Sequence, residues 1–332
     1  MSKSKLLDAQ KKLLDWYEVH GRKELPWRNT EDVYSIYVSE IMLQQTQVKR
    51  VMEEYYPQFL LKFPSLLALS QASLEEVFGM WSGLGYYRRA KNLHQSAILS
   101  RDGLPKDLES LQKLPGIGKY TASALCSFAY NQKVSVVDTN IARVLARYFG
   151  VENVKETHLW ELAELFLNSS APKAHNLALM DLGAMVCLPK NPSCTLNDSQ
   201  EMPLGCQCPF IESCKGANNP LKYYKTKSKV YENKTLHFGI CIQDGKIAMK
   251  TSTEGMYKDM LKLPDIEKYH HETNLIGSFK HSVTRYRLEV HVYTADSVEE
   301  DVLWLPLEML PNAPISSMTQ KALKLSKAIL HD

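Results

Sequence analysis

The amino-acid sequence predicts a mainly α-helical domain followed by a small α+β domain. Up to about residue 215, apolar residues recur at the spacing of amphipathic helices, and short segments with proline or glycine separate these stretches. Beyond residue 233 the pattern changes to the alternation of half-buried strands. The length of 332 residues also suggests about two domains. We therefore expect a helical domain over residues 1–215, a linker over 216–233 and a second domain over 234–332.

The composition excludes several classes of protein. Hydrophobic residues make up 44% and charged residues 23%, which is ordinary for a soluble globular chain. The net charge of +3 permits nucleic-acid binding without demonstrating it. No apolar run approaches the roughly 18 residues of a membrane-spanning helix, and no secretory signal is visible at the start. We expect a cytoplasmic protein with no membrane partner, and a monomer as the simplest assembly.

The helices of the first domain follow from their apolar stripes. Leu6, Leu13 and Tyr17 mark the first helix. Further stripes cover residues 65–80, 86–100, 119–130, 140–149 and 157–168. One more helix is expected from about Asp107 to Leu114.

The second domain begins with a strand pattern. Leu236, Phe238 and Ile240 alternate with polar or small residues, and Asp244-Gly245 predicts a hairpin turn. Residues 286–292 read as another half-buried strand. Residues 317–330 read as a single amphipathic helix.

The stretch LPGIGK predicts a tight turn between two helices. Gly116 and Gly118 permit a close backbone approach and unusual φ angles. Their N–H groups lie at the start of a helix that Lys119 opens, where a phosphate oxygen can bind. A plain helix–helix turn is the alternative.

Asp138 ends an apolar run and begins the next helix. An aspartate at this place commonly serves as an N-cap. The helix dipole also favours its ionised form, which suits the stabilisation of a cationic sugar. The two roles are compatible.

Glu40 lies on the apolar stripe of its helix. Val33, Ile36, Tyr37, Glu40 and Ile41 share one helical face. Burial there would raise the pKa of the carboxyl and keep a proton donor near neutral pH. The alternatives are a poorly buried helix or a structural ion pair.

Five of the seven cysteines lie between residues 187 and 214. In a reducing compartment such a group indicates a metal or iron–sulfur site rather than disulfides. The candidate ligands are Cys187, Cys194, Cys208 and Cys214, with Cys206 as an alternative to Cys194. Four thiolates suit a [4Fe–4S] cluster, and zinc is the competing metal.

Several stretches together resemble the adenine DNA glycosylases of the MutY type, which belong to the helix-hairpin-helix DNA glycosylases. These stretches are LPWR from Leu25, SEIMLQQTQV from Ser39, WSGLGYYRRAKNLH from Trp81, LPGIGKYTA from Leu114, VDTNIARVLAR from Val137 and MDLGAMVC from Met180. The resemblance implies a helix-hairpin-helix part over about 27–138 and an iron–sulfur part formed by 1–26 and 139–215. The outer cysteine spacings match the family's cluster loop, with residues 195–205 as an insertion.

The C-terminal resemblance is shorter. Gly255-Met256-Tyr257 with Leu263-Pro264, and FKHSVTRYRLEV from Phe279, resemble the Nudix-like recognition domain of these enzymes. The Nudix hydrolase box itself is absent from the sequence, so we expect no pyrophosphohydrolase activity.

The resemblance implies a double-stranded DNA substrate in which adenine lies opposite 8-oxoguanine or guanine. Adenine would leave the stack before excision. Glu40 would protonate N7, Asp138 would stabilise the sugar cation and Asn140 would orient Asp138. Trp27 and Arg28 would line the adenine pocket.

The same resemblance places further residues on the DNA. Those implied to contact the opposite base or the DNA backbone are Gln44, Gln45, Thr46, Leu84, Tyr86, Arg88, Arg89, Lys91, Gly116, Gly118, Lys119, Thr284 and Arg285. Tyr86 would wedge into the stack and Tyr87 would pack in the core. The alternative for the basic residues is a solvated helix face.

Tyr120 stands where endonuclease III-type enzymes carry a lysine that attacks the sugar. Tyrosine cannot form a Schiff base, so we expect a monofunctional glycosylase. One alternative is a bifunctional endonuclease III-type glycosylase/AP lyase, which Tyr120 disfavours. Another is a non-catalytic iron–sulfur DNA-binding module, which the pair Glu40 and Asp138 disfavours.

Two positions depart from the family. Relatives have Phe-Ser-His where this chain has Val283-Thr284-Arg285 in the loop that reads 8-oxoguanine. Thr284 keeps the hydroxyl, whereas Arg285 keeps a donor and adds full charge. Leu177 replaces the glutamate or glutamine of relatives, so part of the adenine recognition has to come from elsewhere or be weaker.

Overall fold

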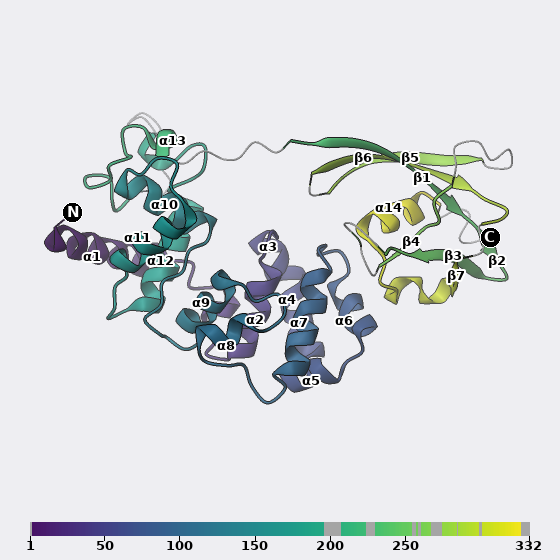
Figure 1. The fold of residues 1–332 in the computed structure, drawn as a ribbon, viewed down its shortest axis with the longest axis horizontal. Coiled ribbons are helices and arrows are strands. Elements are labelled where there is room, and N and C mark those ends of the chain that lie inside the picture. The colour runs from purple at the N-terminus through teal and green to yellow at the C-terminus, as the bar shows by residue number, and fades with distance from the viewer. Residues whose placement is uncertain are drawn as a thin grey trace. The chain divides into compact units, whose positions relative to one another are not determined.

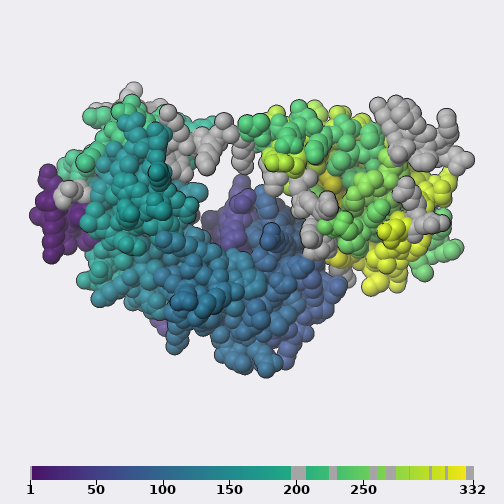
Figure 2. All heavy atoms as spheres, in the orientation of Figure 1, coloured from purple at the N-terminus to yellow at the C-terminus, as the bar shows by residue number. Residues whose placement is uncertain are grey.

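The computed structural model describes residues 2–195, 207–223, 230–253, 257, 260–266, 274–283, 285–298 and 301–326 (Figure 1 and Figure 2). Its tertiary contacts divide the chain into two compact units. Unit 1 comprises Met1–Gln45 and Leu99–Lys227, and unit 2 comprises Thr46–Ile98 and Ser228–Asp332. The domain limits expected from the sequence stay a prediction. Within the described residues, no helix is long and apolar enough to cross a membrane.

Unit 1 is helical, as its apolar stripes predict. Its elements are α1 (Lys3–His20), the 3₁₀ turn η1 (Pro26–Arg28), α2 (Val33–Met42), α8 (Leu108–Gln112), α9 (Lys119–Phe128), α10 (Thr139–Phe149), α11 (Glu156–Phe166), α12 (Pro172–Met185), the 3₁₀ turn η3 (Ser193–Thr195) and α13 (Pro220–Tyr223).

Helix α10 is at the centre of one part of unit 1. It begins where the Asp138 carboxylate accepts the N–H of Ile141, and it ends at Gly150, whose φ of 65° a side chain would strain. Ile141 and Leu145 are fully buried, because α10 packs against α11 and α12. Helix α1 also packs on α12 (Figure 1). Residues far apart in sequence therefore meet around α10 and α12.

The predicted helix–turn–helix over residues 107–119 is confirmed. Asp107 caps α8, and Gly116 turns the chain with a φ of 75°. Helix α9 then begins after Gly118, and no described side chain caps its first N–H groups. Helix α9 packs against α2, so the turn that precedes α9 lies beside the helix that contains Glu40.

Unit 2 begins with a second group of helices. They are α3 (Val48–Arg50), the π-helical turn η2 (Val51–Tyr55), α4 (Tyr56–Lys62), α5 (Leu66–Gln71), α6 (Leu74–Trp81) and α7 (Arg88–Leu99). The stripe over 65–80 forms two helices rather than one, since Ser73 and Glu76 form a capping box that starts α6. Helix α7 begins at Arg88 and not at residue 86, because Tyr86 has a φ of 49°.

The C-terminal part of unit 2 contains two small sheets. Strands β1 (Glu232–Ile240), β6 (Tyr286–Thr294) and β5 (Leu275–Val283) form one sheet, with β1 parallel and β5 antiparallel to β6. Strands β2 (Ile242–Gln243), β3 (Lys246–Thr251), β4 (Leu261–Lys262) and β7 (Leu303–Pro306) form the other. A 3₁₀ turn, η5 (Leu307–Asn312), and α14 (Ser317–Leu325) follow.

Apolar residues of both sheets and of α14 share one core. Val290 and Ile247 are fully buried, and Met318 of α14 packs with them. The alternation in β1 and β6 is confirmed, and Asp244 and Gly245 turn the β2–β3 hairpin with φ of 49° and 71°. Strands β4, β5 and β7 have no comparable alternation in the sequence. Within unit 2, the Tyr87 hydroxyl also donates to the Ile315 carbonyl at 3.2 Å.

Two sequence expectations need correction. Pro220–Tyr223 lies in the predicted linker but forms α13, where Pro220 is buried and its carbonyl accepts the Arg147 Nε–H at 2.9 Å. The C-terminal helix ends at Leu325, with Ser326 as its C-cap, and residues 327–330 of the predicted helix lie outside the described residues. Residues 224–229 of the predicted linker lie outside the described residues.

Candidate active site

Glu40 is buried in unit 1, as its place on the apolar stripe predicts. Its side chain is on α2, and the residue is only 7% exposed. The Tyr120 hydroxyl, from α9, donates to Glu40 Oε2 at 2.8 Å. The turn before α9 therefore brings a phenol against a carboxyl 80 residues away in the sequence.

The environment of Glu40 favours its protonated form. Burial, together with the nearby Asp138 carboxylate, raises the pKa of Glu40 to about 7 against the lowering effects of Tyr120 and Arg28. Burial and the same two carboxyls also hold the pKa of Tyr120 well above its ordinary value. Tyr120 thus stays a neutral donor. The arrangement provides one carboxylic acid that can give up a proton near neutral pH.

Asp138 caps α10, as predicted, and faces the same neighbourhood. Its Oδ1 accepts the Ile141 N–H at 2.7 Å, and its Oδ2 accepts the Asn140 side-chain amide at 2.9 Å. The helix start is not the only influence on the ionisation of this group. Burial raises the pKa of Asp138 above its ordinary value, although the hydrogen bonds and Arg143 oppose that shift.

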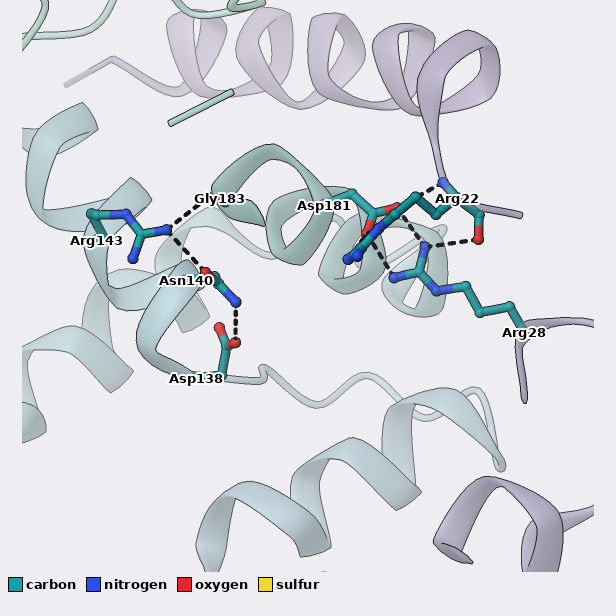
Figure 3. Close-up of polar contacts among 7 residues, drawn as sticks. All are labelled: Arg22, Arg28, Asp138, Asn140, Arg143, Asp181 and Gly183. Atoms are coloured by element: carbon teal, nitrogen blue, oxygen red, sulfur yellow. Dashed lines mark hydrogen bonds and ion pairs between the residues drawn. The ribbon is translucent and has the colours of Figure 1, made fainter. Parts of the chain in front are cut away.

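Arg143 orients Asn140, a link that the sequence did not reveal (Figure 3). Its guanidinium donates to Asn140 Oδ1 at 2.9 Å, to the Gly183 carbonyl at 2.7 Å and to the Cys187 carbonyl at 2.7 Å. A Cβ on Gly183 would lie 2.6 Å from the Cβ of Asn140. The close approach of α12 to α10 therefore fixes the amide that holds Asp138.

Arg28 is engaged by a buried aspartate. Asp181, which is fully buried on α12, accepts from both terminal nitrogens of Arg28 and from Nε of Arg22 at 2.8 Å (Figure 3). Burial would raise the pKa of Asp181, but the two arginines lower it overall. Arg28 is therefore oriented by this pair, and Trp27 beside it is 7% exposed.

A cavity of about 460 Å³ opens beside Arg28. Leu177 also lines it, together with Tyr17, Lys23 and Lys173. Two residues that the sequence links to adenine thus share one cavity, whereas Trp27 is not among its described lining residues. The volume lies in the range of small-ligand pockets.

The glycine turn presents open backbone groups. A Cβ on Gly118 would meet no atom within 4 Å, so the start of α9 is accessible. Lys119 is exposed, and its ammonium lies 4.0 Å from the centre of the Trp160 ring. Gln44, the first residue of the QQT stretch, points its amide toward Thr121 of α9 at 3.5 Å.

The predicted DNA-contact residues of unit 2 divide into exposed and buried groups. Tyr86 is 41% exposed, Arg88 is exposed and Tyr87 is buried, as predicted. Leu84 differs from the prediction, because it is 6% exposed and packs in the interior. Arg89 also differs, as only 9% of it is exposed and burial lowers its pKa to about 10.

The remaining predicted DNA-contact residues differ in their exposure. Gln45 is exposed with a φ of 58°, Thr46 is partly buried, and Lys91 is also partly buried. Arg285 is exposed after β5 and pairs with Glu232 at 3.0 Å. Thr284 lies outside the described residues.

Four of the candidate cysteines face one another. Cys187, Cys194, Cys208 and Cys214 line a single small cavity of about 20 Å³. Burial raises the pKa of Cys208 to about 12 and of Cys214 to about 11, so these thiols need a positive partner to ionise. Cys206 lies outside the described residues.

Arg147 organises this loop, another role that the sequence did not reveal. Its guanidinium donates to Cys187 Sγ at 3.3 Å and to the Leu188 and Pro189 carbonyls at 2.7 and 3.0 Å. Among the described residues, no three Cys, His, Asp or Glu side chains are placed to hold one metal ion. Four thiols around a shared cavity suit either an iron–sulfur cluster or a single zinc ion.

Comparisons with known proteins identify the family. Residues 38–167 match the HhH-GPD superfamily of base excision DNA repair proteins. The adenine DNA glycosylase of Buchnera aphidicola subsp. Schizaphis graminum is 34% identical over 268 residues, which are 77% of this chain and 74% of the relative. The human adenine DNA glycosylase is 40% identical over 61% of this chain and 38% of its own length.

The fold has relatives among solved structures. A thermostable thymine-DNA glycosylase superposes with a TM-score of 0.57 at 29% identity, over 65% of this chain and 97% of its own. The helical part of the fold is therefore that of a DNA glycosylase. From these matches and the paired carboxyls of unit 1, the chain belongs to the adenine DNA glycosylase family of the HhH-GPD superfamily.

Proposed function

We propose that the protein is a monofunctional adenine DNA glycosylase that excises adenine opposite 8-oxoguanine or guanine in base excision repair. The observation that supports this most strongly is the pair of carboxyls in unit 1. Glu40 is buried with a pKa raised to about 7, and Asp138 lies close enough to contribute to that rise. Such a pair, one protonated and one ionised, suits the cleavage of a glycosidic bond.

The reaction begins with protonation of the flipped base. Glu40 gives its proton to N7 of adenine, and the C1′–N9 bond breaks with its electron pair moving to the base. Asp138, held by Asn140 and the Ile141 N–H, stabilises the positive charge that develops on the deoxyribose. Water then adds its hydroxyl to C1′ and leaves a proton on a carboxylate. The products are adenine and an abasic site.

Tyr120 supports the monofunctional subtype. Its hydroxyl is committed to Glu40 at 2.8 Å, and a phenol cannot form a Schiff base with the sugar. The alternative amine, Lys119, lies against Trp160 at 4.0 Å. The strand would therefore stay intact after base release.

Duplex DNA is the partner that fits the surface groups. The open N–H groups at the start of α9 suit a phosphate, and Tyr86 is exposed for a wedge. The cavity beside Arg28 and Leu177 would receive part of the extruded nucleotide. We further propose that the C-terminal α+β part is the Nudix-like domain that reads the opposite base, with Arg285 at its β5–β6 turn.

A [4Fe–4S] cluster is the cofactor that fits the cysteine loop. Cys187, Cys194, Cys208 and Cys214 would ligate it, and the Arg147 guanidinium would donate to a ligand sulfur. Bound there, the cluster would supply cross-links between the two ends of the loop rather than chemistry on the DNA. Arg143 and Arg147 would carry the resulting rigidity to α10.

An excision assay with the opposite base varied tests the proposal. A duplex with adenine opposite 8-oxoguanine, guanine or thymine is incubated with the protein, and strand breaks are counted with and without hot alkali. We expect breaks only after alkali, and only with 8-oxoguanine or guanine opposite. Breaks without alkali would contradict the monofunctional subtype, and release of a pyrimidine instead would contradict adenine specificity.

A further inference from the structure

The buried guanidinium of Arg89 contacts the turn that carries Tyr86 in unit 2. We propose that Arg89 is a positioning residue that fixes the turn Leu84–Tyr86, together with Thr46, in the shape that pries the base pair apart. This inference rests on the proposed function. It replaces the expectation that Arg89 contacts a phosphate, because the side chain is only 9% exposed.

The polar contacts of Arg89 converge on two separate segments. One terminal nitrogen, Nη2, lies 3.2 Å from each of three acceptors: the Thr46 hydroxyl, the Leu84 carbonyl and the Gly85 carbonyl. Thr46 belongs to the QQT stretch that precedes α3, whereas the two carbonyls belong to the turn after α6. A charged donor therefore ties together the two segments that the opposite base is expected to meet.

The same guanidinium supports two aromatic rings. Its carbon lies 5.4 Å from the centre of the Trp81 ring and 5.5 Å from the centre of the Tyr86 ring. Trp81 is fully buried, and its Nε1 donates to the Gly85 carbonyl at 3.1 Å. Tyr86, which is 41% exposed, thus rests on a cation that is itself backed by the core.

The turn needs this support because its backbone is strained. Tyr86 has a φ of 49°, in the left-handed region that residues with side chains rarely adopt. Such a conformation costs free energy and persists only where its surroundings determine it. Arg89, on the following helix α7, provides these surroundings through its contacts with the turn.

Tyr55 contacts the other end of the turn. The Tyr55 hydroxyl donates to the Ser82 carbonyl at 2.9 Å and accepts from Arg50 at 3.2 Å. A Cβ on Gly83 would lie 2.4 Å from the Tyr55 hydroxyl, so the phenol and the turn are in close contact. Tyr55 is the last residue of the π-helical turn η2.

Support of the turn by Arg89 should affect base extrusion and not bond cleavage. Forcing adenine out of the stack costs free energy, and a wedge contributes only if its support is rigid. Loss of Arg89 should therefore slow reaction on a well-stacked duplex. The loss should be much smaller where the adenine is already unstacked.

The experiment compares Arg89→Lys with wild type under single-turnover conditions on two DNAs. In one, adenine lies opposite guanine in a fully paired duplex; in the other, the pairs on both sides of the same A:G pair are mismatched. Arg89→Lys keeps the charge but replaces the planar guanidinium, whose Nη2 reaches the three acceptors, with an ammonium. We expect excision to fall roughly tenfold on the paired duplex and less than about threefold on the mismatched one, since tenfold corresponds to part of the extrusion cost.

The matched control is Arg101→Lys, on an exposed arginine, which should match wild type on both DNAs. Tyr55→Phe serves as a second variant if Arg89→Lys folds poorly, and it should show the same substrate dependence with a smaller loss. Fluorescence of 2-aminopurine in place of the adenine should rise less with both variants than with wild type. Equal losses on the two DNAs, or no loss at all, would overturn the positioning role. A wild type that releases no adenine from either DNA would instead overturn the proposed function, while the fluorescence comparison would still report on Arg89.

Discussion

At the scale of single residues, the proposed chemistry depends on the burial and hydrogen-bond partners of the Glu40 and Asp138 carboxyls. The burial of Glu40 could be predicted from one helical stripe, and the capping by Asp138 from its place before α10. The partners could not be predicted in the same way, because the Glu40–Tyr120 bond joins residues 80 positions apart. The raised pKa of Asp138 was also hidden, since it depends on burial by elements that the local pattern does not show.

Glu40→Gln should stabilise the fold at alkaline pH while removing most of the activity. The folded pKa of Glu40 is raised from 4.5 to about 7, so the folded state loses stability as the pH rises between these values. At pH 8 the buried carboxylate costs about 3 kcal/mol, which a neutral amide avoids in part. We expect a thermal midpoint several degrees above wild type at pH 8 and little difference at pH 4.5. A variant whose midpoint follows that of wild type across this range would show that the ionised carboxylate costs nothing in the fold.

At the scale of elements, close helix packing fixes the positions of the proposed catalytic groups. The contact of α12 with α10 brings Gly183 against Asn140, and Arg143 ties both to the cysteine loop. The helices themselves were predictable from periodicity, but these contacts between them were not. Strand β5 differs: its burial alternates from Gly277 to Val283, but the half-buried positions include Gly277 and His281, so its sequence gave no clear strand signal.

Gly183→Ala should weaken excision through a displaced Asn140. The new Cβ would lie 2.6 Å from the Asn140 Cβ and 3.0 Å from its backbone, and these atoms cannot move independently of α10. We expect a loss of about 1–3 kcal/mol in stability and a lower single-turnover rate with little change in DNA binding. The matched control is Gly277→Ala, whose Cβ would meet the nearest atom at 3.5 Å. An active Gly183→Ala protein with wild-type stability would show that the α10–α12 contact does not set the geometry.

At the scale of the whole molecule, the cysteine loop closes a long stretch of chain. Four thiols from residues 187–214 line one cavity, and Arg147 holds the loop from α10. The spacing of the cysteines was visible in the sequence, whereas the role of Arg147 was not, since an arginine on a helix is usually expected at the surface. Its exposed fraction of 1% shows how far this position departs from that expectation.

Iron content should depend on these four cysteines. The purified protein should be brown, with about four irons per chain, and Cys214→Ser should lose both the colour and part of the stability. Cys126→Ser is the control, because Cys126 is buried elsewhere in unit 1 with its thiol toward the Lys106 carbonyl. Colourless wild-type protein with one zinc would contradict the cluster.

The pH dependence of adenine release tests the role of Glu40 most directly. Single-turnover excision opposite guanine is measured from pH 5 to pH 9, with DNA binding checked at each pH. Because Glu40 must carry a proton to act and its pKa lies at about 7, the rate should fall about tenfold for each pH unit above that value. Glu40→Gln should show no such decline, since its residual rate lacks the titrating acid. A wild-type rate that stays level between pH 6 and pH 9 would contradict the assignment of Glu40 as the proton donor.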